Sequence, residues 1–195
     1  MSEWIIKQRL KDTTDYSSKS LQEIYADVVA LGYETDKGTT HSYIDSYAKL
    51  FEPYRGKPIN FLEVGINFGY SLVLWKRYFH NATIYGIDNR NVLQVNEGAN
   101  ILFYDANNPD ITSKFYSNVE FDVIIDDASH EVDHQVIRFP IYFPKLKTDG
   151  LYVIEDVQCL DKEGHLLTNL NPTAEVIDLR KVKDRYDDVM ITYKK

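Results

Sequence analysis

The sequence is poor in cysteine, in basic residues and in long apolar runs. Cys159 is the only cysteine in 195 residues, which excludes an intramolecular disulfide and fits a reducing compartment. Lysine and arginine total 22 against 30 aspartate and glutamate residues, and the formal charge of −8 argues against nucleic acid or an anionic membrane as main partner. Residues 1–12 mix charged and apolar side chains, unlike a signal peptide or a membrane span. We therefore expect a soluble cytoplasmic protein.

From Pro58 onward, short apolar runs alternate with segments of helical periodicity, as in a parallel sheet covered on both faces. The expected strands are 59–64, 83–87, 101–105, 121–125 and 151–155. The expected helices are Ser71–Tyr78, Thr112–Tyr116 and Val132–Leu146, with a short one in the 89–98 connection.

The last part of the chain has a different sequence pattern. After Gln158 we expect a polar loop that contains Gly164, followed by two β-rich runs, TAEVIDLR and DDVMITYK. Because no helix is expected between these runs, they should pair as an antiparallel hairpin at the edge of the sheet. Together the patterns predict an α/β fold, a Rossmann-like three-layer α/β/α sandwich with a mostly parallel seven-stranded sheet and a C-terminal antiparallel hairpin.

Two amphipathic helices are expected before the sheet. The first follows the candidate cap Ser20 and ends around Gly32, and the second covers residues 42–52 and stops near Pro53. We expect residues 1–56 to form a helical extension or lid and residues 57–195 to form the main domain. A lid and a homo-oligomer contact both remain open as roles for these helices.

The first strand runs into an acidic residue and a Gly-x-x-x-Gly turn, Glu63 to Gly69, where glycine lets a ligand approach the backbone. The next strand ends in Asp88, whose carboxylate can accept hydrogen bonds from both hydroxyls of a ribose. This pairing favours a nucleoside site over a simple tight turn. The turn lacks the G-x-G-x-x-G pattern of dinucleotide enzymes, so a NAD-dependent oxidoreductase is the weaker alternative.

Acidic pairs follow two other strands, Asp126-Asp127 and Glu155-Asp156. Carboxylates gathered at the carboxyl edge of a sheet repel one another unless a cation lies among them, and oxygen ligands favour Mg²⁺. His130 lies three residues after Asp127 and is a candidate general base. The alternative is that the aspartates cap the next helix and His130 bonds to its backbone. His41 either lines the pocket or caps a helix.

These motifs, in order, resemble those of class I S-adenosylmethionine (SAM)-dependent methyltransferases, through ExGxxxG at 63–69, Asp88, and Asp105 after the third strand. More narrowly, residues 33–158 resemble the metal-dependent sugar O-methyltransferases of macrolide tailoring, the mycinamicin type. The segments that carry this likeness are TDKG with His41, DVIIDDASH and VIEDVQ.

The resemblance implies roles for particular residues. SAM would be contacted by Lys37, Glu63, Gly65, Asn67, Gly69, Ser71, Asp88, Asp105, Ala106 and Asp126. Mg²⁺ or another divalent cation would be held by Asp127, Glu155 and Asp156, and the catalytic residues would be His130 and Asp127.

The implied reaction is methyl transfer to a hydroxyl of a small sugar-like acceptor. A sulfonium methyl group is already activated, so the enzyme has mainly to align the acceptor oxygen and remove its proton. A metal that binds vicinal oxygens suits catechols as well as sugars, so a catechol-type O-methyltransferase remains an alternative. A non-catalytic SAM-binding protein is the third, and calorimetry with SAM, NAD and Mg²⁺ would separate these.

Overall fold

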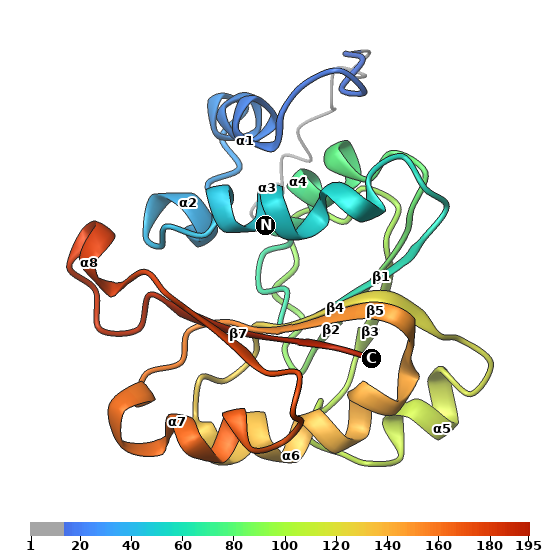
Figure 1. Cartoon of the computed structure of the whole chain (residues 1–195). Coiled ribbons are helices and arrows are strands. Elements are labelled where there is room, and N and C mark those ends of the chain that lie inside the picture. Colours follow the sequence, from blue (N-terminus) through green and yellow to red (C-terminus); the bar gives the residue numbers. More distant parts are fainter. Residues whose placement is uncertain (1–13) are drawn as a thin grey trace, which may run out of the picture.

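The computed structural model describes residues 14–195, in which one sheet lies between two layers of helices (Figure 1). The strand order is β3-β2-β1-β4-β5-β7-β6, with β1 to β5 parallel and the last two strands antiparallel. The strands are β1 Asn60–Val64, β2 Thr83–Asp88, β3 Asn100–Phe103, β4 Phe121–Asp126, β5 Leu146–Ile154, β6 Glu175–Asp178 and β7 Val189–Lys194. The predicted sandwich and its antiparallel hairpin are confirmed.

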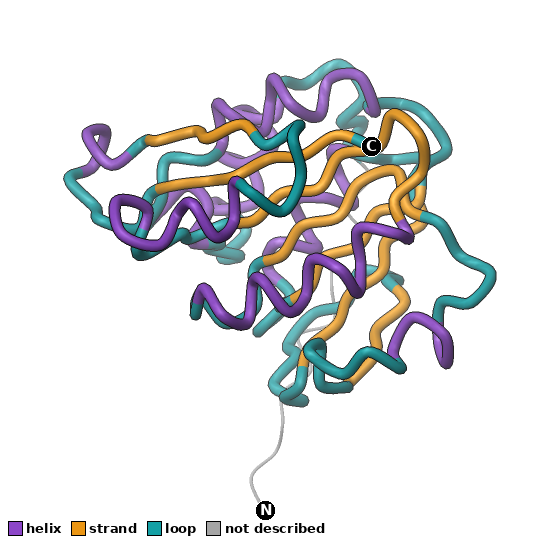
Figure 2. Tube along the Cα trace, turned by 60° about the horizontal axis from the view of Figure 1, so that its bottom comes forward, coloured by secondary structure: helices purple, strands orange, loops and turns teal. Residues whose placement is uncertain are grey.

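The helices divide between the two faces of this sheet (Figures 1 and 2). On one side lie α1 Leu21–Ala30, α2 Asp36–Thr39, α3 Ile44–Phe51 and α4 Tyr70–Tyr78, with the 3₁₀ turn η1 Glu52–Tyr54 after α3. On the other side lie α5 Ile111–Phe115, α6 Val132–Tyr142 with η2 Phe143–Lys145, and α7 Leu160–Thr168. The one-turn helix α8 Arg180–Lys183 lies in the connection between β6 and β7.

The N-terminal helices are part of the core on their side of the sheet. Tyr47 and Phe51 of α3 are fully buried and pack edge-to-face on Trp75 of α4. Phe51 also contacts Phe61 of β1. Each buried aromatic side chain of this kind contributes roughly 1.5–3 kcal/mol through the hydrophobic effect. The predicted division of the chain at residue 56 stays a prediction.

Helix α1 begins as the sequence predicts. The Ser20 hydroxyl accepts a hydrogen bond from the Glu23 amide at 3.2 Å, and the Glu23 carboxylate accepts one from the Ser20 amide at 2.7 Å. This reciprocal capping box satisfies two amides that the first turn leaves without helical partners. The helix ends at Ala30, and Gly32 follows with a φ of +85°.

One prediction about the C-terminal part is wrong, because the expected polar loop after Gln158 contains helix α7. Gly164 lies buried inside this helix, where a Cβ atom would come within 2.8 Å of the Leu160 side chain. Glycine weakens helical propensity and charged residues dilute the apolar pattern, so the helix depends on its packing against the rest of the protein.

Three smaller predictions also differ from the structure. The predicted helix Val132–Leu146 ends at Tyr142, because Pro144 lies in a 3₁₀ turn and Leu146 already pairs with Phe121 in the sheet. The 89–98 connection has no helix, and the hairpin connection includes α8.

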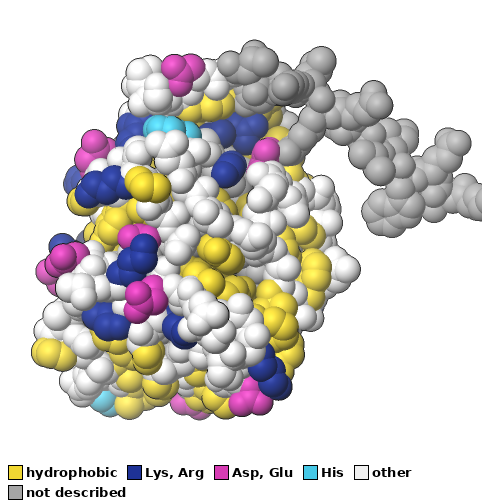
Figure 3. Space-filling model, turned by 90° about the vertical axis from the view of Figure 1, so that its right-hand side faces the viewer, with side chains coloured by type: hydrophobic (Ala, Val, Ile, Leu, Met, Phe, Trp, Pro, Cys, Tyr) yellow, Lys and Arg dark blue, Asp and Glu magenta, His cyan; other side chains and the backbone are white. Residues whose placement is uncertain are grey.

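Across residues 14–195 no helix is both long enough and apolar enough to cross a membrane. On the side of the molecule shown in Figure 3, acidic and basic side chains are interspersed among apolar ones.

Candidate functional site

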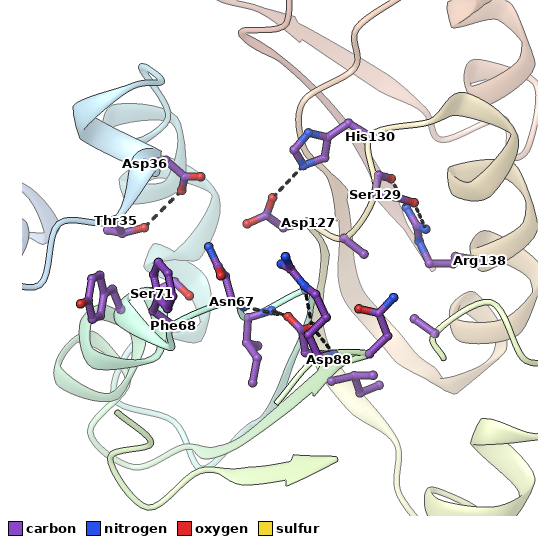
Figure 4. A pocket seen from close by; sticks show the side chains of 18 of the residues that line it. Thr35, Asp36, Asn67, Phe68, Ser71, Asp88, Asp127, Ser129, His130 and Arg138 are labelled. Carbon is purple, nitrogen blue, oxygen red and sulfur yellow. Dashed lines mark hydrogen bonds and ion pairs between the residues drawn. The ribbon is translucent and has the colours of Figure 1, made fainter. Parts of the chain in front are cut away.

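A cavity of about 690 Å³ opens at the carboxyl edge of the parallel strands (Figure 4). Its floor is the turn between β1 and α4, which depends on two glycines. Gly65 has a φ of +89°, and a Cβ atom there would lie 2.1 Å from the Asp127 carbonyl oxygen. Gly69 has a φ of +83°, and a Cβ atom would lie 2.1 Å from the Val95 carbonyl oxygen. Any other residue at these positions would force the turn to move.

Asp88 at the end of β2 shapes this turn. Its Oδ2 accepts hydrogen bonds from the amides of Ile66 at 3.1 Å and Asn67 at 2.8 Å, and its Oδ1 accepts one from the Arg90 amide at 2.8 Å. Figure 4 shows the Asp88 carboxylate directed at the turn beside the cavity. Asp88 therefore fixes the backbone that a ligand would meet, and it also lines the cavity.

The cavity collects six of the ten residues that the resemblance assigns to the cofactor. They are Gly65, Asn67, Ser71, Asp88, Asp105 and Ala106. The opposite wall includes Thr35 and Asp36, the neighbours of Lys37 in the TDKG segment, which face Asp127 and His130 in Figure 4. The N-terminal segment is thus one wall of the cavity.

The other four residues assigned to the cofactor, Lys37, Glu63, Gly69 and Asp126, do not line the cavity. Glu63 is fully buried behind the turn and accepts a hydrogen bond from the Ser71 hydroxyl at 2.7 Å. Asp126 points to the other face of the sheet, where the Arg138 Nε lies 2.8 Å from both of its oxygens. Successive residues of a strand point to opposite faces, so adjacent residues such as Asp126 and Asp127 reach different surroundings.

Lys37 lies among carboxylates that come from three different strands. Its Nζ lies 2.6 Å from Glu155 Oε2, 2.7 Å from Asp127 Oδ2 and 3.2 Å from Glu63 Oε1. The Tyr47 hydroxyl donates to the other oxygen of Glu155. Burial by itself would lower the pKa of Lys37, but the three carboxylates outweigh it and raise that pKa well above its ordinary value.

The same charge acts on Asp127. Burial by itself would raise the pKa of Asp127, whereas the Lys37 charge and the hydrogen bonds from His130 and Lys37 lower it to about 2. Asp127 is therefore ionised at neutral pH.

A second group, next to the cavity, consists of Asp127, His130 and Asp156. His130 Nε2 lies 3.4 Å from Asp127 Oδ1 and 3.3 Å from Asp156 Oδ2. One ligand atom from each residue falls within 4.8 Å of the others, close enough to share a metal ion. Asp156 has a φ of +54°, which departs from the strand conformation and brings its carboxylate to this side. Glu155, predicted as a metal ligand, lies outside this group.

His130 is half-buried and lines the cavity. Burial would lower its pKa, but the hydrogen bond to Asp127 and the charges of Asp156 and Asp127 raise it. The residue before α6 is Glu131, whose side chain makes no capping hydrogen bond, so neither the aspartate pair nor His130 serves as the helix cap.

Sequence reasoning left His41, Tyr43 and Tyr47 without a definite role. The Tyr43 hydroxyl donates to Asp156 Oδ1 at 2.6 Å, and His41 Nε2 lies 3.3 Å from the same oxygen. On its other side, His41 Nδ1 lies 3.5 Å from Asp188 Oδ1. The available signal was the pair of tyrosines, four residues apart, that begins two residues after a histidine.

No family model matches the chain. It is 33% identical over 140 residues to an 8-demethyl-8-alpha-L-rhamnosyl tetracenomycin-C 2′-O-methyltransferase of Streptomyces olivaceus, which covers 67% of this chain and 37% of that protein. It is 35% identical over 136 residues to the demethylmacrocin O-methyltransferase of Streptomyces fradiae, which covers 64% of this chain and 34% of that protein. The chain spans about a third of the length of these relatives.

Solved structures agree on the fold. The MycE methyltransferase of the mycinamycin pathway, in complex with Mg and SAH, matches with a TM-score of 0.69 and 25% identity over 90% of this chain and 54% of that chain. An O-methyltransferase from Bacillus cereus in complex with SAH matches at 15% identity with a TM-score of 0.58, over 95% of this chain and 94% of that chain. The second match supports the fold alone.

Proposed function

Starting from a chain with the class I SAM-dependent methyltransferase fold and sequence similarity to sugar O-methyltransferases, we propose that it transfers a methyl group from SAM to a hydroxyl of a sugar or related small polyol. Mg²⁺ or another divalent cation assists the transfer. The observation that carries the proposal is one cavity that is lined by the glycine turn, Asp127 and His130, with Asp156 beside His130.

The residues present fit the cofactor. Gly65 lines the cavity, and its positive φ and its close packing on the Asp127 backbone fix the turn that a ligand would meet. Asp88 ends β2, where nucleoside sites in this type of fold carry the acid that binds the ribose, and Asn67, Asp105 and Ala106 line the same cavity. A volume of 690 Å³ lies within the roughly 300–1,000 Å³ of ordinary ligand pockets.

The residues present also fit a divalent cation. Asp127 and Asp156 would hold it, since their carboxylate oxygens face the same point beside His130. Glu155 remains a predicted third ligand, although Lys37 and Tyr47 bond to its two oxygens here. A cation bound there would supply Lewis-acid chemistry, orienting two vicinal hydroxyls and lowering the pKa of one.

His130 would take the proton from the acceptor hydroxyl. Its ring lies at the cavity wall, and Asp127 and Asp156 hold Nε2 between them and stabilise the protonated form. A positioned general base of this kind contributes on the order of 10²–10⁴-fold in rate. Tyr43 holds Asp156 in place by donating a hydrogen bond at 2.6 Å.

Methyl transfer from labelled SAM tests this function with three acceptors. These are a glycoside with vicinal hydroxyls, the same glycoside lacking one of them, and a catechol. We expect transfer to the first, loss of transfer in EDTA and recovery with Mg²⁺.

Faster methylation of the catechol than of the glycoside would instead favour a catechol-type O-methyltransferase. Calorimetry completes the test: tight SAM binding without transfer to any acceptor would favour a non-catalytic protein, and binding of NAD in place of SAM would contradict methyl transfer.

A further inference from the structure

Lys37 is a buried cation that is surrounded by carboxylates. It belongs to the short helix α2, yet its side chain has no exposure and reaches the ends of three strands. Its partners are Glu63 of β1, Asp127 after β4 and Glu155 after β5. Lys37 Nζ donates hydrogen bonds to Glu155 and Asp127 and forms an ion pair with Glu63. Lys37 is fully buried and does not line the cavity in which a cofactor would bind.

Helix α2 is held in place from two sides. A Cβ atom on Gly38 would lie 2.4 Å from the Tyr25 ring of α1, which shows how closely α2 packs there. From the C-terminal hairpin, Lys183 Nζ donates to the carbonyl oxygens of Gly38 at 2.6 Å and His41 at 2.5 Å. The backbone that carries Lys37 is thus fixed by packing and by hydrogen bonds outside the cavity.

The two oxygens of Asp127 have different partners. Oδ2 lies 2.7 Å from Lys37 Nζ, and Oδ1 faces His130 Nε2 at 3.4 Å. A carboxylate tied at one oxygen has a defined direction for the other, so the position of Lys37 sets the orientation of Asp127.

We propose that Lys37 is a positioning residue whose ammonium is the built-in cation of the site: it forms ion pairs with the buried Glu63 and Glu155 and holds Asp127 so that Oδ1 faces His130 and the cavity. The part of this inference that concerns catalysis rests on the proposed function. It differs from the role implied by the resemblance, in which Lys37 contacts SAM.

The test compares Lys37→Met, Glu63→Gln and the double variant by thermal unfolding. Lys37 offsets part of the cost of burying the Glu63 carboxylate, and that offset is lost in Lys37→Met. The effect of Glu63→Gln on the melting temperature should therefore be more stabilising in the Lys37→Met background than in the wild type. A role in packing alone would give the same effect in both backgrounds.

Lys183→Met is the matched control, because it removes a lysine that contacts the same segment but no carboxylate of the site. In that background Glu63→Gln should change the melting temperature as it does in the wild type. If Lys37→Met does not fold, a folded double variant supports the proposal. Failure of both to fold, with Glu63→Gln alone folded, overturns it, as does an equal effect of Glu63→Gln in the wild-type and Lys37→Met backgrounds.

Calorimetry with SAM and a methyl-transfer assay complete the experiment. We expect Lys37→Met, or the double variant, to bind SAM within about threefold of the wild type while kcat falls at least about tenfold, a loss of the size seen when a partner that orients a site residue is removed. A large loss of SAM affinity with normal kcat would restore the cofactor role and overturn this one. If the wild type does not bind SAM, the proposed function fails, and the unfolding experiment still decides the charge role of Lys37.

Discussion

Asp126 and Asp127 are neighbours in the sequence, yet they belong to two different regions of the molecule. Asp126 lies on the α6 face, where Arg138 bonds to both of its oxygens and the pair is almost fully buried. Asp127 lies on the opposite side, between Lys37 and His130, at the edge of the cavity. Both oxygens of Asp126 belong to one buried ion pair, which we call the closed side, whereas Asp127 has one oxygen on Lys37 and the other facing His130 beside the cavity, which we call the open side. The comparison shows that the partner, and not the residue type, decides whether an acid is structural or chemical.

The largest effect is expected on the open side. His130→Ala should lower kcat by on the order of 10²–10⁴-fold, because the proton acceptor is lost, and should leave SAM affinity unchanged. Steady-state kinetics and calorimetry measure the two quantities. His134→Ala is the matched control, since its Nδ1 lies 2.8 Å from the Ser129 hydroxyl instead of a carboxylate of the site. Equal losses in the two variants would contradict the assignment of His130.

On the closed side the expected effect is on stability. Arg138→Leu leaves the Asp126 carboxylate buried without its partner, which should cost about 3–5 kcal/mol in the free energy of unfolding. Urea denaturation measures this loss. The double variant Asp126→Asn/Arg138→Leu should recover part of it, because the unpaired charge is gone. No recovery would mean that the pair matters through packing and not through charge.

A pH experiment sharpens the difference between the carboxylates of the open side. Burial and the charge of Asp127 raise the pKa of Asp156 to about 6, so the folded state without divalent ions holds a proton that the unfolded state has released. Stability should therefore fall as pH rises from about 4 to 6, by on the order of 1–3 kcal/mol. Urea denaturation in EDTA at several pH values measures this fall.

Asp156→Asn should reduce this fall, while Glu155, whose pKa burial also raises, still contributes in the same direction. Asp127, with a pKa lowered to about 2, contributes in the opposite direction, and its stabilisation is lost only as pH falls from about 4 toward 2. If the stability of the wild type and of Asp156→Asn changes equally between pH 4 and 6, the assignment is contradicted.

The smallest effect is expected at the N-terminal cap of α1, which belongs to neither region. Ser20→Ala removes the capping hydroxyl of α1 and should cost about 1 kcal/mol of stability. Because α1 holds none of the carboxylates or their partners, methyl transfer should be unchanged. Thermal unfolding and the transfer assay check both parts, and a loss of turnover would show that α1 influences the site.

The fold could largely be predicted from the sequence, because it depends on local patterns. Alternating apolar runs and helical segments predicted the parallel sheet, and Gly65 with Gly69 predicted the turn at its edge. Helix α7 could not be predicted in this way. Its pattern is weak around Gly164, and only contacts with the rest of the protein make it a helix.

The candidate site could be predicted in part. The sequence placed Asp127 and His130 near a cavity because both follow a strand that ends at the same edge as β1. The sequence could not predict which side chain pairs with each carboxylate. Lys37 and Glu155 are 118 positions apart, and no local pattern connects them.

The sequence by itself determined which atoms are present at the edge of the sheet: glycines at the turn, carboxylates at the strand ends and one histidine beside them. Strand period and turn chemistry are properties of neighbouring residues, so they can be read along the chain. Only the tertiary structure decided that Arg138 closes the Asp126 side and that Lys37 leaves one oxygen of Asp127 facing His130. The physical reason is that the field at a buried carboxylate comes from whichever charges are nearest in space, and here these come from distant parts of the chain.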